Sequence, residues 1–146
     1  MKPSVLMDTN ILVSGLVFRR GNEHKLLQLV EDGAVSLVLP EYVVAEAKRV
    51  LAAKFSGYEG LLDVFLAHIE SRIVSWEEIR LFVSAASLKV RDGKDAVVLA
   101  SVIAADPDIF VTGDVELRED AAAIIGFERC LTSSMLLELL TQSTGK

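Results

Sequence analysis

The sequence predicts an α/β fold, in which a central and mainly parallel sheet lies between two layers of helices as a three-layer α/β/α sandwich. Several short segments are almost continuous runs of Val, Ile and Leu, a pattern typical of parallel strands that are covered on both faces. Between them, apolar residues recur at helical spacing. Strands that alternate with helices along the chain favour this layered architecture, with right-handed crossover connections.

The elements can be placed from these two patterns. Strands are expected at residues 4–7, 35–39, 72–75, 109–112 and 127–131. Helices are expected at residues 23–32, 41–55, 61–69, 96–105 and 134–140. A further helix is expected after each of Asp8 and Asp114. Asp114 is placed to cap its helix, and Asp8 to stabilise the Thr9-Asn10 turn into the other.

The 146 residues suit one domain, which we place at residues 1–140, with residues 141–146 as a flexible tail. The longest uncharged apolar stretch, residues 96–105, is far shorter than the ~20 residues of a membrane-spanning helix. Asp8 comes too early for the apolar segment of a signal peptide. We therefore expect a soluble, cytoplasmic protein. Its single cysteine, Cys130, excludes an internal disulfide and a metal site made of cysteines.

Composition bears on the partners. The hydrophobic content of 51% is higher than a small monomer needs, which suggests a self-association surface and a homodimer. The formal net charge of −6 argues against a broad basic surface for nucleic acid.

Acidic residues stand where the expected strands end or the following helices begin. Asp8 directly follows the first strand and Asp114 follows the fourth. Asp92 and Asp95 precede a helix, and Glu46 lies in the first turns of another helix. Ligands of such folds bind beyond the carboxyl ends of the parallel strands. We therefore expect these five acids to converge on one edge of the sheet.

Each acid taken alone has an ordinary explanation, as a helix cap or as a solvent-facing helix residue. Together they would repel one another and raise one another's pKa values unless a cation neutralised them. Mg²⁺ and Mn²⁺ prefer oxygen ligands and leave positions for water and phosphate. Without these five acids the net charge of −6 would be −1, so the acidity is partly the site itself.

The sequence also resembles a known family, the PIN domains, over nearly the whole chain. The matching motifs are, in chain order, Asp8-Thr9-Asn10, Glu46, Asp95 at the head of an alanine-rich helix, and Val111-Thr112-Gly113-Asp114. The stretch Val90-Arg91-Asp92-Gly93-Lys94-Asp95 is similar to the VapC-like subgroup, the toxins of toxin–antitoxin pairs.

The resemblance implies an endoribonuclease that hydrolyses single-stranded RNA with Mg²⁺ or Mn²⁺, often as a homodimer, with an antitoxin protein as partner. The catalytic residues, which would hold one or two metal ions, are then Asp8, Glu46, Asp95 and Asp114.

Four neighbouring polar residues are expected to support these ligands. Thr9 and Thr112 would orient carboxylates or water. We expect Asn10 to cap the first helix rather than bind substrate. Asp92 is expected to cap a helix beginning near Gly93, which leaves Asp95 as the ligand.

Basic residues near the expected site are either a solvated surface or contacts to the phosphate backbone of RNA. These candidates are Arg19, Arg20, Lys48, Arg49, Arg91 and Lys94.

Two other functions stay open. One is a catalytically silent PIN fold that binds proteins. The other is a receiver-type phosphoacceptor domain, which is disfavoured because no Asp ends the middle strands and no Lys follows the last one. No Ser-His-Asp or Cys-His arrangement is evident, so a side-chain nucleophile is not expected.

Overall fold

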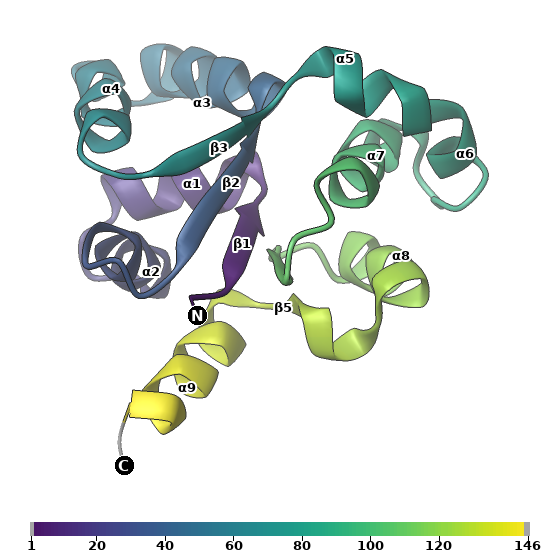
Figure 1. The fold of residues 1–146 in the computed structure, drawn as a ribbon. Helices are drawn as coiled ribbons and strands as arrows, with labels where there is room; N and C mark the ends of the chain where they lie inside the picture. Colours follow the sequence, from purple (N-terminus) through teal and green to yellow (C-terminus); the bar gives the residue numbers. More distant parts are fainter. Residues whose placement is uncertain (1, 145–146) are drawn as a thin grey trace.

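In a computed structural model, residues 2–144 are described, apart from the side chains of Lys94, Ser143 and Thr144. Five parallel strands form one sheet in the order β3-β2-β1-β4-β5 (Figure 1). The strands are β1 (Ser4–Met7), β2 (Ser36–Pro40), β3 (Ser71–Val74), β4 (Ile109–Val111) and β5 (Cys130–Leu131).

Helices connect the strands and cover both faces of the sheet (Figure 1). Those of the first half are α1 (Thr9–Val17), α2 (Asn22–Glu31), α3 (Glu41–Lys54) and α4 (Glu59–Ala67). Those of the second half are α5 (Trp76–Ile79), α6 (Val83–Ser87), α7 (Ala96–Ala105), α8 (Val115–Ile125) and α9 (Ser133–Thr144). Short 3-10 turns lie at Arg80–Phe82, Gly93–Asp95 and Phe127–Arg129.

Two hydrophobic cores flank the sheet because successive side chains of a strand point to opposite faces. Val5 and Met7 of β1 pack into the core that α1–α4 and α9 cover. Leu6, between them, packs into the core formed with α5–α8. All three side chains are fully buried. The predicted three-layer α/β/α architecture is confirmed.

The first two helices pack unusually closely. A Cβ at Gly15 of α1 would lie 2.6 Å from the Leu27 side chain of α2, so only glycine permits this approach. His24 of α2 completes the contact through its Nδ1, 2.7 Å from the Gly15 carbonyl oxygen. This packing fixes α1, and with it the acid that precedes α1.

Most predicted boundaries shift by one or two residues, and the larger departures are three. Residues 127–129 form a 3-10 turn, so β5 is shorter than predicted. The strand pairs only with β4, which itself has three residues. Helix α9 continues to Thr144, into the segment expected to be a tail, and residues 145–146 lie outside the described part. Residues 76–87 form α5, a 3-10 turn and α6, which no pattern predicted. No helix in residues 2–144 is long and apolar enough to cross a membrane.

Candidate active site

A cleft of about 870 Å³ opens at the carboxyl ends of β1 and β4. The chain leaves β1 toward β2 on one side, while β4 pairs with β1 on the other. This reversal of strand order is where ligands bind in open α/β sheets. The four acids that the sequence singles out as ligands all line the cleft: Asp8, Glu46, Asp95 and Asp114.

Thr112 links the two acids that follow β1 and β4. Its hydroxyl donates to Asp8 Oδ2 at 2.6 Å and accepts the Asp114 backbone N–H at 3.1 Å. Asp8 Oδ1 accepts the Ile11 backbone N–H at 3.2 Å, which caps α1. Because Thr112 is fully buried, this bridge holds Asp8 in one orientation. The predicted orienting role of Thr112 therefore has a direct geometric basis.

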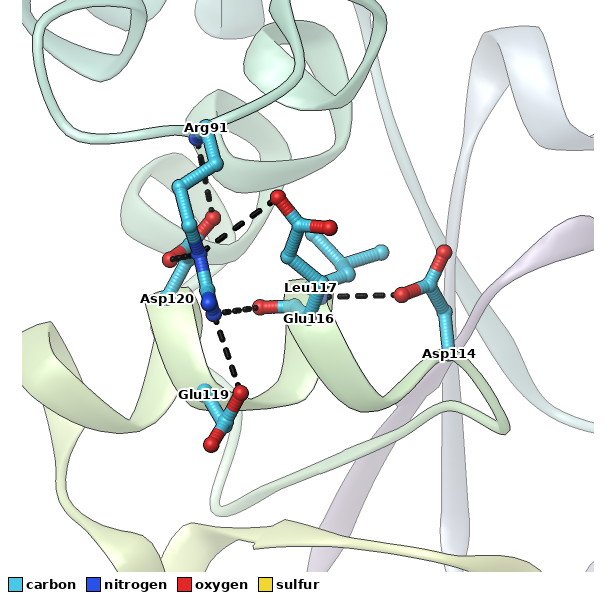
Figure 2. A network of polar contacts seen from close by, with 6 residues as sticks. All are labelled: Arg91, Asp114, Glu116, Leu117, Glu119 and Asp120. Atoms are coloured by element: carbon cyan, nitrogen blue, oxygen red, sulfur yellow. Dashed lines mark hydrogen bonds and ion pairs between the residues drawn. The ribbon is translucent and has the colours of Figure 1, made fainter.

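Asp114 caps α8 in the same way. Its Oδ1 accepts the Leu117 backbone N–H at 3.0 Å (Figure 2). Among the described residues nothing donates to its other oxygen, and the residue is exposed to the cleft. One carboxylate oxygen thus fixes the side chain while the second is available to a ligand.

Asp95 and Glu46 come from helices on opposite sides of the sheet. Asp95 ends the 3-10 turn before α7 and makes no side-chain capping hydrogen bond. Its backbone N–H donates to the Asp92 carbonyl at 2.9 Å. Glu46, on α3, is partly exposed and lies 3.7 Å from the Arg49 guanidinium. A helical turn begins at Gly93, as expected, but it is a 3-10 turn, and the α-helix itself begins at Ala96.

Negative charge accumulates in the cleft. Burial raises the pKa of Asp8 and the charge of Asp114 raises it further, while hydrogen bonds from Thr112 and Ile11 oppose the shift. Burial also raises the pKa of Asp95, to which Asp114 and other nearby acids contribute. In the described part of the chain no cationic side chain pairs with Asp8, Asp95 or Asp114.

The donor set fits a hard divalent cation. Its groups are carboxylate oxygens, the ligands that Mg²⁺ and Mn²⁺ prefer. No three Asp, Glu, His or Cys side chains among the described residues already stand close enough to enclose a metal ion. Mg²⁺ does not require such a cage, since one or two carboxylates with several water ligands commonly hold it.

The remaining polar residues of the first motif also lie at the cleft. Thr9 is buried and Asn10 is exposed, and both line it. The expectation that Asn10 caps α1 was wrong, because Asp8 already occupies the extended position before the helix and its carboxylate accepts the Ile11 N–H. Asp92 is exposed and does not line the cleft.

Arg91 is the centre of an ion-pair network that joins the segment before Asp95 to α8 (Figure 2). Its Nε lies 3.0 Å from Asp120 Oδ1, and its backbone N–H donates to Asp120 Oδ2 at 3.2 Å. Its Nη2 donates to Glu119 Oε1 at 3.1 Å and to the Glu116 carbonyl at 3.0 Å. Asp120 is buried. The positive charge of Arg91 is therefore already matched within the molecule.

The other basic candidates whose side chains are described do not line the cleft. Arg19, Arg20, Lys48 and Arg49 are exposed, and none of them lines the cleft. Lys48 pairs with Asp63 of α4 at 3.3 Å. The side chain of Lys94 lies outside the described residues.

Several cleft residues were not recognised from the sequence. Tyr42 and Trp76 line the cleft, and Thr132 and Ser133, which follow β5, line it too. Trp76 comes two residues after β3, so the rule that identified Asp8 and Asp114 could also have identified it. Burial raises the pKa of Tyr42, with contributions from Glu46, Asp8 and Asp95.

Comparison with known proteins identifies the family. The family model described as PIN domain matches residues 4–116, and the chain belongs to the PIN domain family. The crystal structure of VapBC2 from Rickettsia felis, bound to a DNA fragment from their promoter, has a similar fold. Its TM-score is 0.60 at 17% sequence identity, over 77% of this chain and 89% of that one. A comparison with curated proteins gives no match.

The receiver-type alternative does not survive these findings. Receiver-like folds have the strand order 2-1-3-4-5, in which the first strand is not at the centre. Here β1 is central in the order β3-β2-β1-β4-β5.

Proposed function

We propose that this protein is a metal-dependent endoribonuclease that hydrolyses phosphodiester bonds of single-stranded RNA. One observation carries the proposal. Four acids from four separate segments line a single cleft at the switch point of the sheet, in a chain that belongs to the PIN family. Burial, and to a lesser extent the neighbouring carboxylates, raise the pKa values of Asp8 and Asp95, and a divalent cation would relieve this cost.

The residues have distinct tasks in this proposal. Asp8, Glu46, Asp95 and Asp114 hold Mg²⁺ or Mn²⁺, as one or two ions. A bound ion of this kind supplies an activated water and stabilises the negative charge that develops on the phosphate. Thr112 positions Asp8 through its 2.6 Å hydrogen bond.

The net charge of −6 is compatible with an RNA substrate, because bound divalent cations would offset the charge of the four carboxylates and would attract phosphate. Phosphates outside the cleft would meet the exposed Arg19, Arg20, Lys48 and Arg49. Asn10, which is exposed and lines the cleft, would contact a nucleotide next to the cleaved bond, and the buried Thr9 would orient a carboxylate or water.

The proposal extends to partners. We place the protein in the toxin class of toxin–antitoxin pairs, with an antitoxin protein and a second copy of the chain as partners. The fold shared with VapBC2 and the sequence around Asp92 and Asp95 support the first partner. The 51% apolar content supports the second.

RNA cleavage by the purified protein tests the function. We expect single-stranded RNA to be cut with Mn²⁺ or Mg²⁺ and to stay intact with EDTA. Asp8→Asn should abolish cleavage without unfolding the protein. The matched control is Asp32→Asn, an exposed acid just after α2, near the start of β2 at the opposite edge of the sheet.

Two outcomes would contradict the proposal. Turnover by Asp8→Asn at the rate of the unmodified protein would exclude the carboxylate mechanism. A well-folded protein that cuts no RNA with any divalent cation would instead support the catalytically silent interaction module.

A further inference from the structure

We propose that Trp76 is a stacking platform for a nucleobase of the RNA bound in the cleft. This inference rests on the proposed function. It adds a contact with the base of a nucleotide, whereas the proposed carboxylate site acts only on the phosphate. The indole lines the same cleft as Glu46 and Asp95, and Trp76 is 43% exposed.

The local structure holds Trp76 at the active edge of the sheet. Ser75 follows β3, and its Oγ accepts the Glu78 backbone N–H at 3.3 Å, so α5 begins at Trp76. Ile79, at the end of the same short helix, is fully buried in the core that includes Leu99 of α7. The backbone under Trp76 is therefore anchored, although part of its side chain stays open to solvent.

Trp76 shares the cleft with both apolar and acidic residues. Val97 and Val98 of α7 line the cleft with it, and α5 packs against α7. Asp95 directly precedes α7, so the same helix carries both the apolar surface and one of the acids. A flat apolar surface thus adjoins the place where carboxylates would hold a cation.

A nucleotide matches this juxtaposition. It joins an anionic phosphate, which a cation-loaded carboxylate site attracts, to a flat base with a π-face. Stacking on aromatic side chains is the contact that proteins use for single-stranded nucleic acid without sequence preference, because every base has such a face. A protein segment that covered Trp76 would also have to bury the charges of Glu46 and Asp95, which is costly.

The chain contains one tryptophan, so its fluorescence reports on this site alone. The protein is titrated with dye-labelled single-stranded RNA in Ca²⁺, and the RNA is checked for integrity afterwards. We expect the tryptophan emission to be quenched with the same midpoint as the rise in RNA anisotropy. An abasic ribose-phosphate chain of equal length should leave the emission unchanged.

Variants supply the second readout. Trp76→Leu should weaken RNA binding about tenfold and raise KM more than it lowers kcat, whereas Trp76→Phe should retain most of the affinity. The matched control is Phe127→Leu, an aromatic residue that is 68% exposed and does not line the cleft. Its RNA affinity should equal that of the unmodified protein.

The outcomes separate the two proposals. If RNA binds by anisotropy while the emission and the affinity of Trp76→Leu stay unchanged, the stacking platform is wrong and the nuclease proposal stands. If the unmodified protein binds no RNA with any divalent cation, both proposals fail.

Discussion

Asp8 and Asp114 each cap a helix with one carboxylate oxygen, and each also lines the cleft. From the sequence, capping and metal binding were competing explanations of these acids. Capping uses one oxygen of Asp114, and among the described residues nothing donates to the other, so capping does not preclude metal binding by that carboxylate. The cap fixes the orientation of the carboxylate. The buried Thr112 hydroxyl links the two caps, because it donates to Asp8 and accepts the backbone N–H of Asp114.

The raised pKa of Asp8 predicts that Asp8→Asn stabilises the metal-free fold at neutral pH. In the folded protein the carboxyl binds its proton more tightly than in the unfolded chain. Stability therefore falls as the pH rises from the ordinary value of 3.8 through the raised pKa, and the whole cost remains at pH 7. Asn carries no charge and avoids this cost.

Melting temperatures of both proteins in EDTA, from about pH 3 to pH 8, check this prediction. The advantage of Asp8→Asn should be largest near neutral pH and should shrink as the unmodified Asp8 becomes protonated. An Asn variant that melts below the unmodified protein at neutral pH would show that the charge of Asp8 is not a burden to the apo fold.

Asp92 and Asp95 should differ in their effect on cleavage. Asp95 lines the cleft and spends no oxygen on capping, whereas Asp92 lies outside the cleft. We expect Asp95→Asn to lose most activity and Mn²⁺ affinity, and Asp92→Asn to keep most of both, with stability little changed because Asn caps about as well as Asp. Cleavage rates and Mn²⁺ titrations of the two variants decide, and a more damaging Asp92→Asn would reverse the roles.

The elements predicted well are those with long, regular patterns. Residues 96–105 were predicted as a helix and form α7 with the same bounds, and β1 likewise occupies the predicted residues 4–7. The four acids were identified because strand ends are recognisable in the sequence. Residues 76–87 were not assigned because α5 and α6, of four and five residues, are too short for a helical period to repeat. For the same reason Trp76 was missed, although it follows a correctly predicted strand.

The partners of Arg91 could not be predicted either. They lie 25 to 29 residues away along the chain, on α8, and only the packing of α7 against α8 brings them together. The sequence left two interpretations of this residue open, a solvated surface or a phosphate contact. The structure instead shows Arg91 fastening the segment that ends at Asp95 to the helix that begins after Asp114.

We therefore expect Arg91→Ala to make the distance between Asp95 and Asp114 less well fixed. The variant should weaken Mn²⁺ binding severalfold and speed hydrogen exchange in residues 88–95, because the buried Asp120 loses its cationic partner. Arg80→Ala is the control, since Arg80 makes a comparable 2.9 Å contact with Glu77 outside the cleft. Unchanged exchange and metal affinity in Arg91→Ala would show that the network stabilises neither the segment before Asp95 nor the metal site.

At the scale of the whole molecule, large apolar side chains remain exposed on the second half of the chain. Leu81 and Leu88, on the α5–α6 segment, are 71% and 88% exposed, and Val115 is 69% exposed. Such side chains are what a self-association surface requires. Light scattering at micromolar concentration should give twice the 15.9 kDa mass of one chain, and a single species of one chain's mass would refute the homodimer.

Metal binding should be visible as stability of the whole domain. The acids that line the cleft come from segments after β1, within α3, before α7 and after β4, so an ion held between them ties distant parts of the chain together. A ligand that binds only the folded state stabilises it by mass action, by about 2.7 kcal/mol at one hundred times its dissociation constant. For a domain of this size, each kcal/mol corresponds to roughly 2–4 °C in melting temperature.

Millimolar Mn²⁺ or Mg²⁺ should therefore raise the melting temperature of the unmodified protein by several degrees, and EDTA should reverse the rise. KCl at equal ionic strength separates specific binding from screening, which also relieves repulsion among exposed acids. Asp8→Asn should gain much less than the unmodified protein from the divalent ion and the same from KCl. It would then be the more stable of the two in EDTA and would lose that advantage in Mn²⁺. A melting temperature that responds equally to KCl and to Mn²⁺, in both proteins, would mean that the cleft collects charge without binding a cation.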